Sequence, residues 1–435
     1  MPSNSSILVT TLNAFLLIFF APFFWVLFLL VGILARLFSC RGGKPRLVWG
    51  STPIINNAYW SRAMSELGFA SETFTNQFYS RINKRNDWGR ILQDEYRYCP
   101  HPLRKLMAFS GSLLRYDVFF ISADGFFIGH TVLWRMQAFF FKLAGKKTVL
   151  IPYGGDAYCY RRIRSNETAH GLMMSYPVAS RNQKKVASRL DYWCRHADVV
   201  IPGIMAPDGF GRWDVLAPTS LCLDLSDWSV SGIKSTADGT NASVFIAHAP
   251  NHRGFKGSEF IVDAVATLKD EGLKVELLLL EKKPNAEVRE ILQNSTDILV
   301  EQLICTGHGM NAVEGFASGL PVVSNLEDDD CTTMFRRWSF LNECPIASAS
   351  PESIVDVLRK LVTRPALRSQ LGTAGRQYAE KYLGLDSAQY LFGEVIEFLY
   401  GRRDSLINLY HPLLGDFPKR QPKIQHPLVN NRIVD

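Results

Sequence analysis

The chain has 435 residues, which is too long for one ordinary hydrophobic core and predicts two or three domains. Hydrophobic residues make up 47% and charged residues 20%, proportions that are typical of a globular protein and exclude extensive disorder. The net charge of +7 suits either an anionic partner, such as a nucleotide or an anionic membrane face, or a mildly basic surface without a special partner.

Two further classes are disfavoured by the pattern of charges and cysteines. Nucleic acid is not expected as a partner, because no stripe of Lys and Arg and no basic stretch interleaved with aromatic residues occurs. The 8 cysteines are scattered, without a CxxC pair or the Cys/His spacing of a metal site. We therefore expect reduced thiols in a cytosolic compartment.

Residues 7–35 form an uncharged segment of 29 residues that is dense in Phe, Leu, Ile and Val. A span needs roughly 20 such residues, so the segment predicts membrane attachment, and no basic region precedes it as in a signal peptide. Pro22 leaves open a kinked span or a re-entrant hairpin. The positive-inside rule places the remaining chain in the cytoplasm, because cations follow the segment at Arg36, Arg41, Lys44 and Arg46.

Strand-like and helix-like segments alternate in the first half of the soluble part. RLVWGS (46–51) predicts a buried strand, and the helix-like NAYWSRAMSELG follows it after a Gly/Pro turn. Further strands are predicted at 117–122, 146–152 and 197–202. Alternation of this kind indicates βαβ units and a parallel sheet.

The second half repeats the alternation. Ser258 is a plausible N-cap for an amphipathic helix that follows the strand SVFIAHAP, and Pro284 lies near the start of another helix. A buried strand is predicted at 274–281, further strands at 297–302 and 321–325, and further helices at 352–363, 365–383 and 386–400.

These elements predict an α/β protein with two doubly wound, Rossmann-like domains that face a cleft. A stretch rich in Ser, Gly, Thr and Asp is interpreted as the linker between them. The predicted division is a membrane anchor (1–41), a first domain (42–228), the linker (229–242), a second domain (243–383), a helix packing back toward the first domain (384–410) and an extended, Pro-rich basic tail (411–435).

A basic turn lies where a strand leads into a helix, in HAPNHRGFKGSEF (248–260). Parallel α/β domains bind ligands at this edge of the sheet, and helix N-termini attract phosphates. Arg253 can fork onto phosphate oxygens, Lys256 supplies a compact charge, and Gly257 lets the backbone approach a ligand. The alternative is a solvated basic turn.

A second glycine-containing turn opens TGHGMNAVEGFASGLPVVSN (306–325). Gly307 and Gly309 flank His308 at the start of a short helix, as in a turn that cradles a phosphate. Glu314, further along that helix, can accept hydrogen bonds from a ribose diol. The alternative is that Glu314 is an ordinary surface residue.

Together, HRGFKGSEF and GHGMNAVEGFASGLPVV resemble the retaining GT-B glycosyltransferases of family 4, clearly over 243–330 and more loosely over 46–205. The resemblance implies two Rossmann-like domains and a nucleotide-sugar donor in the cleft. It implies that Arg253 and Lys256-Gly257 hold the donor diphosphate, although their spacing is shorter than in the family, so Lys256 is the better match. It also implies that Glu314 binds the ribose.

The same resemblance implies that the amides of Gly307, His308 and Gly309 meet the donor phosphate and sugar. Thr306 stands where the family carries a further glutamate that contacts the donor sugar. Glu301 or Gln302, at the end of the preceding strand, can substitute for it.

In the first domain, two glycine-containing turns resemble cleft-facing loops of the family. Gly50-Ser51-Thr52-Pro53 matches the loop after the first strand, and Tyr153-Gly154-Gly155-Asp156 matches a Gly-Ser-Asp type turn. Gly50 and Gly155 are therefore expected near the donor and Asp156 among the catalytic residues, whereas His130 is either a cleft residue or a structural one.

The acidic run Glu327-Asp328-Asp329-Asp330 contains a DxD pattern, which binds Mg²⁺ or Mn²⁺ in the other large glycosyltransferase fold. Because a basic diphosphate clamp is already present, a solvated acidic loop is the preferred interpretation. No metal and no other cofactor is expected.

The resemblance implies a membrane-attached enzyme that moves a hexosyl unit from a UDP- or GDP-sugar to an acceptor with retention. The anchor suggests a lipid-linked or glycan acceptor in surface polysaccharide or lipopolysaccharide synthesis. Two alternatives stay open, a sugar-nucleotide 2-epimerase and a non-catalytic membrane scaffold, of which the anchor disfavours the first. A dinucleotide oxidoreductase is less consistent, because GxGxxG is absent after the strands.

Overall fold

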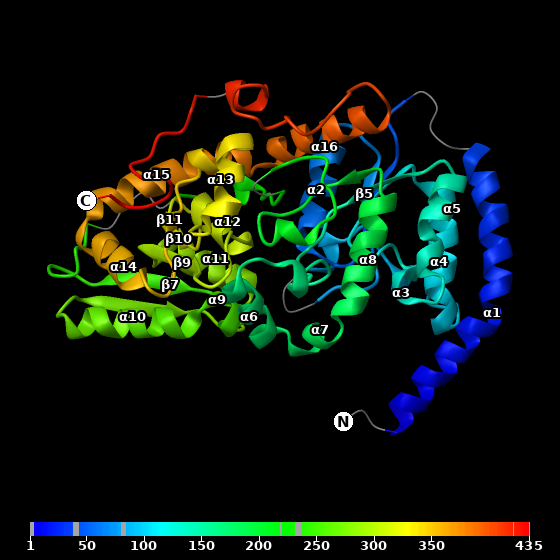
Figure 1. Cartoon of the computed structure of the whole chain (residues 1–435), viewed down its shortest axis with the longest axis horizontal. Coiled ribbons are helices and arrows are strands. Elements are labelled where there is room, and N and C mark those ends of the chain that lie inside the picture. Colours follow the sequence, from blue (N-terminus) through cyan, green and yellow to red (C-terminus); the bar gives the residue numbers. More distant parts are fainter. Residues whose placement is uncertain are drawn as a thin grey trace.

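The computed structural model describes residues 4–37, 43–79, 84–217, 220–230, 236–420 and 422–434. A long N-terminal helix, α1 (Asn4–Leu37), lies at one end of two α/β domains (Figure 1). Predictions that involve Arg41 and linker residues 231–235 lie outside the described residues. Helix α1 is continuous through Pro22, so residues 4–37 do not form the two arms of a re-entrant hairpin.

The first domain contains one parallel sheet with the strand order β3-β2-β1-β4-β5-β6. Its strands are β1 (Leu47–Ser51), β2 (Ser71–Thr75), β3 (Arg90–Ile91), β4 (Val118–Ile121), β5 (Lys147–Leu150) and β6 (Val199–Val200). The four apolar strands predicted from the sequence are confirmed. β2 and β3 were not predicted, because SETFT is mostly polar and β3 has only 2 residues.

Seven α-helices accompany this sheet in the described part of the first domain. They are α2 (Ile55–Glu66), α3 (Leu92–Glu95), α4 (His101–Arg115), α5 (Gln137–Leu143), α6 (Asn166–Ser175), α7 (Pro177–Arg181) and α8 (Gln183–His196). Helices α4 and α5 lie between the sheet and α1 (Figure 1). Phe109, Phe119, Phe140 and Phe141 fill the core on that side.

The second domain also has a parallel sheet, with the order β11-β10-β9-β7-β8. Its strands are β7 (Val244–His248), β8 (Val275–Leu279), β9 (Ile298–Gln302), β10 (Val322–Ser324) and β11 (Ala347–Ser348). Its helices are α9 (Arg253–Lys256), α10 (Ser258–Asp270), α11 (Asn285–Asn294), α12 (Met310–Ala317), α13 (Asp329–Trp338), α14 (Ile354–Thr363) and α15 (Pro365–Tyr382).

Two local predictions in this domain were wrong. β8 was expected to be a buried strand, but it lies at the sheet edge and is partly exposed. Ser258 was expected to cap α10, but Gly257 occupies the cap position in the left-handed region, with φ 71°. The Ser258 hydroxyl instead forms a 2.8 Å hydrogen bond with the buried His248 ring. The short turn α9 therefore ends at a position whose left-handed backbone conformation only glycine adopts easily.

The strand orders locate the site. In each sheet the order reverses once, between β1 and β4 and between β7 and β9. Chains that leave neighbouring strands in opposite directions open a crevice at their carboxyl ends, and ligands of open α/β sheets bind there. The basic turn follows β7 and the Gly307 loop follows β9, so both predicted binding loops lie at the reversal of the second sheet.

The last helix, α16 (Leu385–Leu399), returns to the first domain and packs on α2. Its Phe392 ring lies 4.8 Å from Trp49, 5.6 Å from Trp60 and 5.4 Å from Phe120. The residues after it run back over the second domain (Figure 1). There Asn431 donates to the carbonyl of Cys344 at 2.8 Å. The C-terminal segment therefore contacts both domains.

Candidate active site

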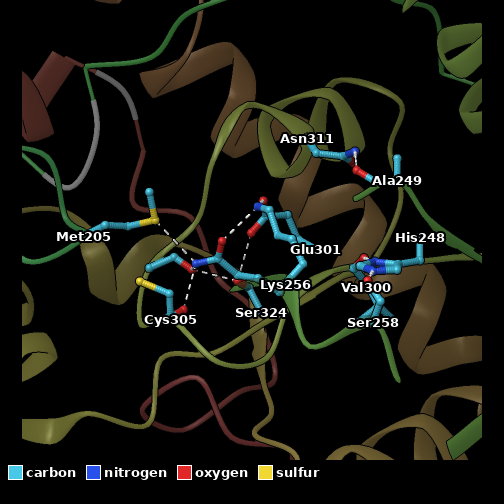
Figure 2. A network of polar contacts seen from close by, with 12 residues as sticks. Met205, His248, Ala249, Lys256, Ser258, Val300, Glu301, Cys305, Asn311 and Ser324 are labelled. Carbon is cyan, nitrogen blue, oxygen red and sulfur yellow. Dashed lines mark hydrogen bonds and ion pairs between the residues drawn. The ribbon is translucent and has the colours of Figure 1, made fainter. Parts of the chain in front are cut away.

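Lys256 lies at the reversal of the second sheet, where β7 and β9 end (Figure 2). Its ammonium forms an ion pair with Glu301 and donates to Gln302 Oε1 at 2.9 Å. Lys256 is 9% exposed and Glu301 is 3% exposed. The lysine is therefore fixed at the expected diphosphate position, with a buried carboxylate balancing its charge.

Gln302 and Ser324 shape the loop that follows β9. Gln302 Nε2 donates to the carbonyls of Cys305 at 2.7 Å and Gly307 at 3.1 Å, and Ser324 Oγ donates to the Gly307 carbonyl at 2.7 Å. Gly307 has φ 111°, and a Cβ on Gly309 would lie 3.3 Å from Glu301 Oε1. The positive φ of Gly307 therefore favours glycine strongly, whereas a side chain at Gly309 would only displace Glu301 by a few tenths of an ångström. No described side chain caps α12 at Gly309, so the amides of its first turn can meet an anion.

His308, between these glycines, is 2% exposed. Neither ring nitrogen has a hydrogen-bond partner among the described residues. Burial lowers its pKa, which keeps the imidazole neutral near pH 7. Buried polar groups are nearly always paired, so this imidazole beside Lys256 and Glu301 retains unused hydrogen-bonding capacity inside the loop.

Glu314 is buried on α12 and accepts a 2.9 Å hydrogen bond from Asn285 Nδ2. Burial raises the pKa of this carboxyl to about 7, opposed by the Asn285 hydrogen bond and by Arg289. Burial and the nearby Glu314 also raise the pKa of Tyr59, on α2 of the first domain, to about 12. Glu314 therefore lies close to the first domain, with acceptor capacity beyond its bond to Asn285.

Arg253 does not join the Lys256 cluster. Its guanidinium forms ion pairs with Glu259 at 2.7 Å and Glu281 at 3.0 Å on the domain surface. The two cations of the basic turn therefore differ in environment, because one is buried at the sheet edge and the other pairs with surface carboxylates.

Helix α6 of the first domain covers the basic turn. Ser175 Oγ accepts from the Phe255 amide at 2.8 Å, and the Tyr176 ring lies 4.4 Å from His252. Phe255 and Cys305 join residues of the first domain, including Leu172, in one buried cluster. No sequence pattern predicts this contact, because it joins segments from different domains.

Asp156 is buried and supports two loops of the first domain. It accepts hydrogen bonds from the amides of Ala123 at 2.8 Å, Tyr153 at 3.0 Å and Gly154 at 3.0 Å. Burial and Asp124 raise its pKa to about 7, and the three amides oppose that rise. Asp156 therefore ties the loop after β4 to the loop after β5.

The two first-domain glycines differ in their surroundings. A Cβ on Gly50 would lie 2.1 Å from the Phe74 carbonyl oxygen of β2, so the neighbouring strand requires glycine there. A Cβ on Gly155 would meet no described atom within 4 Å. Gly155 therefore lies beside open space, whereas Gly50 has a structural reason to be glycine.

A polar network missed by the sequence analysis surrounds Asp124, directly after β4. Asp124 accepts from Arg189 at 2.9 Å and from the Tyr153 hydroxyl at 2.8 Å, and the half-exposed His130 lies 3.4 Å from it. The signal available was the Asp124-Gly125 pair at the carboxyl end of a buried strand. This network lies at the reversal of the first sheet.

A cavity of about 200 Å³ lies between the domains, with Thr306 in its wall. The first domain contributes Arg164, Asp208 and Trp213, and α13 contributes Asp330. Asp208 Oδ2 accepts from the Arg164 amide at 2.8 Å, while its buried Oδ1 has no partner among the described residues. The position at which the family resemblance places a sugar-binding glutamate therefore faces a cavity whose wall combines apolar and charged side chains.

The acidic run at 327–330 is exposed at Asp329 and Asp330, as expected of a solvated segment, but these two residues open helix α13 and do not continue the loop. Asp328 Oδ1 accepts from the Cys331 amide at 3.3 Å as the cap of α13, and Asp329 lies 3.8 Å from Arg336. Carboxylates at a helix N-terminus are stabilised by the helix dipole. Across the described residues, no group of three or more His, Cys, Asp and Glu side chains could hold a metal.

We expect the DxD carboxylates to be dispensable for nucleotide binding. Asp328→Asn keeps a residue that caps helices as well as aspartate, and Asp330→Asn removes a carboxylate from the cavity wall. Calorimetry with UDP and GDP, with and without Mn²⁺, should give the wild-type affinity for both variants. A loss of binding that appears only when Mn²⁺ is present would contradict this expectation.

Known proteins resemble the chain in structure more than in sequence. No profile of a known protein family and no curated protein matches it. Sucrose-phosphate synthase from Thermosynechococcus elongatus is 10% identical with a TM-score of 0.51, covering 83% of this chain and 100% of that one. HepE from Anabaena, in complex with UDP-glucose, is also 10% identical with a TM-score of 0.51, covering 81% and 100%. At this identity the likeness establishes the fold, two Rossmann-like domains in the GT-B arrangement.

Proposed function

We propose that this GT-B chain is a membrane-attached glycosyltransferase. It moves a hexosyl unit from a UDP- or GDP-sugar to a lipid-linked or glycan acceptor, with retention, in the synthesis of a surface polysaccharide or lipopolysaccharide. The observation that carries the proposal is the arrangement of Lys256, the Gly307–Gly309 loop and the buried Glu314 around the reversal of the second sheet. The UDP-glucose in the HepE structure supports a nucleotide-sugar donor.

In the proposed mechanism, the donor diphosphate lies between Lys256 and the first turn of α12. Negative charge grows on the departing diphosphate as the bond between the sugar and its phosphate oxygen breaks. The ammonium and the backbone amides are already fixed in place and oppose that charge, so their stabilisation increases toward the transition state. Glu314 accepts hydrogen bonds from the ribose diol and positions the nucleotide. The cation and amides act as the counter-charge, so the proposed reaction requires no metal.

The sequence suggested Glu301 as a substitute for the family glutamate that contacts the donor sugar. We assign it a different role. Its carboxylate holds Lys256 and lies 3.3 Å from Ser324 Oγ, whose hydrogen goes to the closer Gly307 carbonyl. The donor sugar is then proposed to lie in the cavity that Thr306 lines. Glu301 instead holds the Lys256 ammonium in position before the donor arrives.

Three observations favour a second candidate, a non-catalytic membrane scaffold. Thr306 replaces the family's glutamate, Lys256 is already neutralised by Glu301, and α6 covers the basic turn. Calorimetry with UDP and GDP separates the candidates, since a scaffold would bind neither nucleotide. If a nucleotide binds, incubating membranes and lipid extract with a panel of radiolabelled nucleotide sugars identifies the donor, and absence of transfer from every donor would contradict the enzyme.

A further inference from the structure

One face of α1 is packed against the first domain. The Phe28 ring lies 5.1 Å from Phe109 of α4 and 5.1 Å from Phe140 of α5. A Cβ on Gly32 would lie 3.0 Å from Leu143, and Arg36 donates to the Leu143 carbonyl at 3.5 Å. The C-terminal half of the helix is therefore part of the folded domain.

The opposite face of α1 is apolar, and none of the elements that the structure describes covers it. Its most exposed large side chains follow one another at intervals of three and four residues, which places them on one side of the helix, and the less exposed Phe20, Trp25 and Leu34 flank them. This outer stripe consists of Phe19 (68% exposed), Phe23 (62%), Val26 (51%), Leu30 (63%), Ile33 (56%) and Leu37 (67%). The stripe is about 27 Å long at 1.5 Å per residue. An exposed apolar surface of this extent indicates an interaction site.

The packed residues are also those that resemble a membrane span. Within the described part of the chain, the window that is long and apolar enough to cross a bilayer is Phe19–Leu37, with a mean hydropathy of 2.2. A spanning helix is surrounded by lipid or by other spanning elements. Here one side of the window is covered by α4 and α5 of the first α/β domain, and α5 carries the exposed Lys142. Inserting the window across a bilayer would break this packing or draw the domain into hydrocarbon.

The cations that follow α1 are occupied within the fold. Lys44 donates to the Leu67 carbonyl at 2.6 Å, and Arg46 forms a 2.8 Å ion pair with Asp117. Together with the contact of Arg36 to α5, these partners give the described cations structural roles. Their position after the apolar segment therefore does not require a crossing.

A basic groove of about 320 Å³ lies between Trp134–Met136 and the junction of α7 and α8. Its cations are Arg135, Arg181, Lys184 and Lys185. None of these four forms an ion pair with any residue that the structure describes. Residues 134–136 lead directly into α5, which packs on α1. In Figure 1, α7 and the N-terminal end of α1 both lie toward the lower side of the molecule.

We propose that α1 lies along an anionic membrane surface without crossing it. The outer stripe enters the acyl boundary, and the basic groove binds anionic lipid headgroups. This proposal rests on the membrane attachment in the proposed function and states how that attachment is made. It does not depend on the proposed sugar transfer. A second copy of the chain is a poorer occupant of the stripe, because it would bring together two molecules of net charge +7 and leave the groove without a counter-charge.

Depth measurements distinguish lying from crossing. Phe23→Cys, Leu30→Cys and Leu37→Cys are made one at a time in the full chain, labelled with an environment-sensitive fluorophore, and bound to vesicles of phosphatidylcholine and phosphatidylglycerol in equal parts. Unmodified protein labelled in parallel gives the background from native thiols. Lipids carrying quenchers at different depths should give the same shallow depth for all three labels. A steady change of about 1.5 Å per residue, or about 20 Å from position 23 to 37, would overturn the proposal.

Vesicle flotation tests the two parts of the surface separately. Leu30→Asp should reduce binding at least about tenfold to both anionic and purely zwitterionic vesicles, because it charges the centre of the stripe. Lys184→Glu with Lys185→Glu should reduce binding by a similar factor to anionic vesicles alone, and only at low salt. The matched control is Lys269→Glu on α10, an exposed cation of the second domain, which should bind like the wild type.

Unaltered binding of either the stripe or the groove variant would overturn the corresponding part of the proposal. Sedimentation analysis of the same proteins tests whether a second copy of the chain covers the stripe. A wild-type dimer that becomes monomeric in Leu30→Asp, with unchanged vesicle binding, would assign the stripe to self-association. Thermal unfolding of each variant verifies that it is folded. All of these measurements omit nucleotide, so a failure of the transferase assignment would not affect them.

Discussion

Replacing Lys256 by alanine is expected to slow sugar transfer by about 10²–10³, the usual cost of removing one preorganised charge contact to a transition state. The ammonium is fixed at the end of β7 and β9 by Glu301 and Gln302, so little reorganisation is needed when charge develops on the leaving diphosphate. Initial rates with the donor identified by the nucleotide-sugar panel measure the loss. Transfer at close to the wild-type rate would contradict the assignment of the site.

The buried ion pair makes a stability control necessary. In Lys256→Ala the Glu301 carboxylate remains buried without its cation, and such a loss typically costs about 3–5 kcal/mol. The double variant Lys256→Met, Glu301→Gln removes both charges and should unfold closer to the wild-type temperature while remaining inactive. Recovery of stability without recovery of transfer would separate the chemical role of Lys256 from its role in folding.

Arg253→Ala provides the matched comparison on the same turn. Its guanidinium forms ion pairs with Glu259 and Glu281 at the surface, and exposed pairs contribute little to stability. We therefore expect Arg253→Ala to fold like the wild type and to lose less activity than Lys256→Ala. An equal loss in both variants would show that Arg253 leaves its surface partners when donor binds.

The sequence predicted the elements that carry a strong local signal. Apolar runs such as 117–122 and 297–302 became strands, and the turns after 248 and 302 proved to lie at the reversal of a sheet, where α/β folds bind ligands. A two-residue strand such as β3 carries too little pattern to be recognised. The acidic run at 327–330 was assigned to a loop because carboxylates are common both in loops and at helix starts.

The site itself was predictable only in part, because its contacts join distant segments. Lys256 and Glu301 are 45 positions apart, and their buried pairing follows from strand order, which one sequence does not reveal. The contact of α6 with the basic turn depends on how the two domains meet. Asp156 was predicted from a turn motif, but the three amides that it accepts from could not be inferred from that motif.

Glu314→Gln is expected to weaken binding of a nucleotide sugar by about ten- to a hundredfold or more, since hydrogen bonds to a charged group contribute about 1.5–3 kcal/mol. Glutamine keeps the size of the side chain and a hydrogen bond with Asn285, so the fold should be retained. Calorimetry with the intact donor measures the change, and its diphosphate diester does not titrate near neutral pH. An unchanged affinity would remove Glu314 from the nucleotide site.

The raised pKa of Glu314 predicts opposite pH profiles for stability and binding. Its pKa rises on folding from 4.5 to about 7, so its contribution to stability is fully present below 4.5 and is lost as pH rises through 7. Donor binding needs the ionised acceptor, so affinity should increase over the same interval and level off above it. Glu314→Gln should remove this part of both profiles. Asn285→Ala, which deletes a hydrogen bond that lowers this pKa, should move the midpoint of binding to higher pH. If affinity in the wild type is constant from pH 5 to 8, the diol contact is not made by this carboxylate.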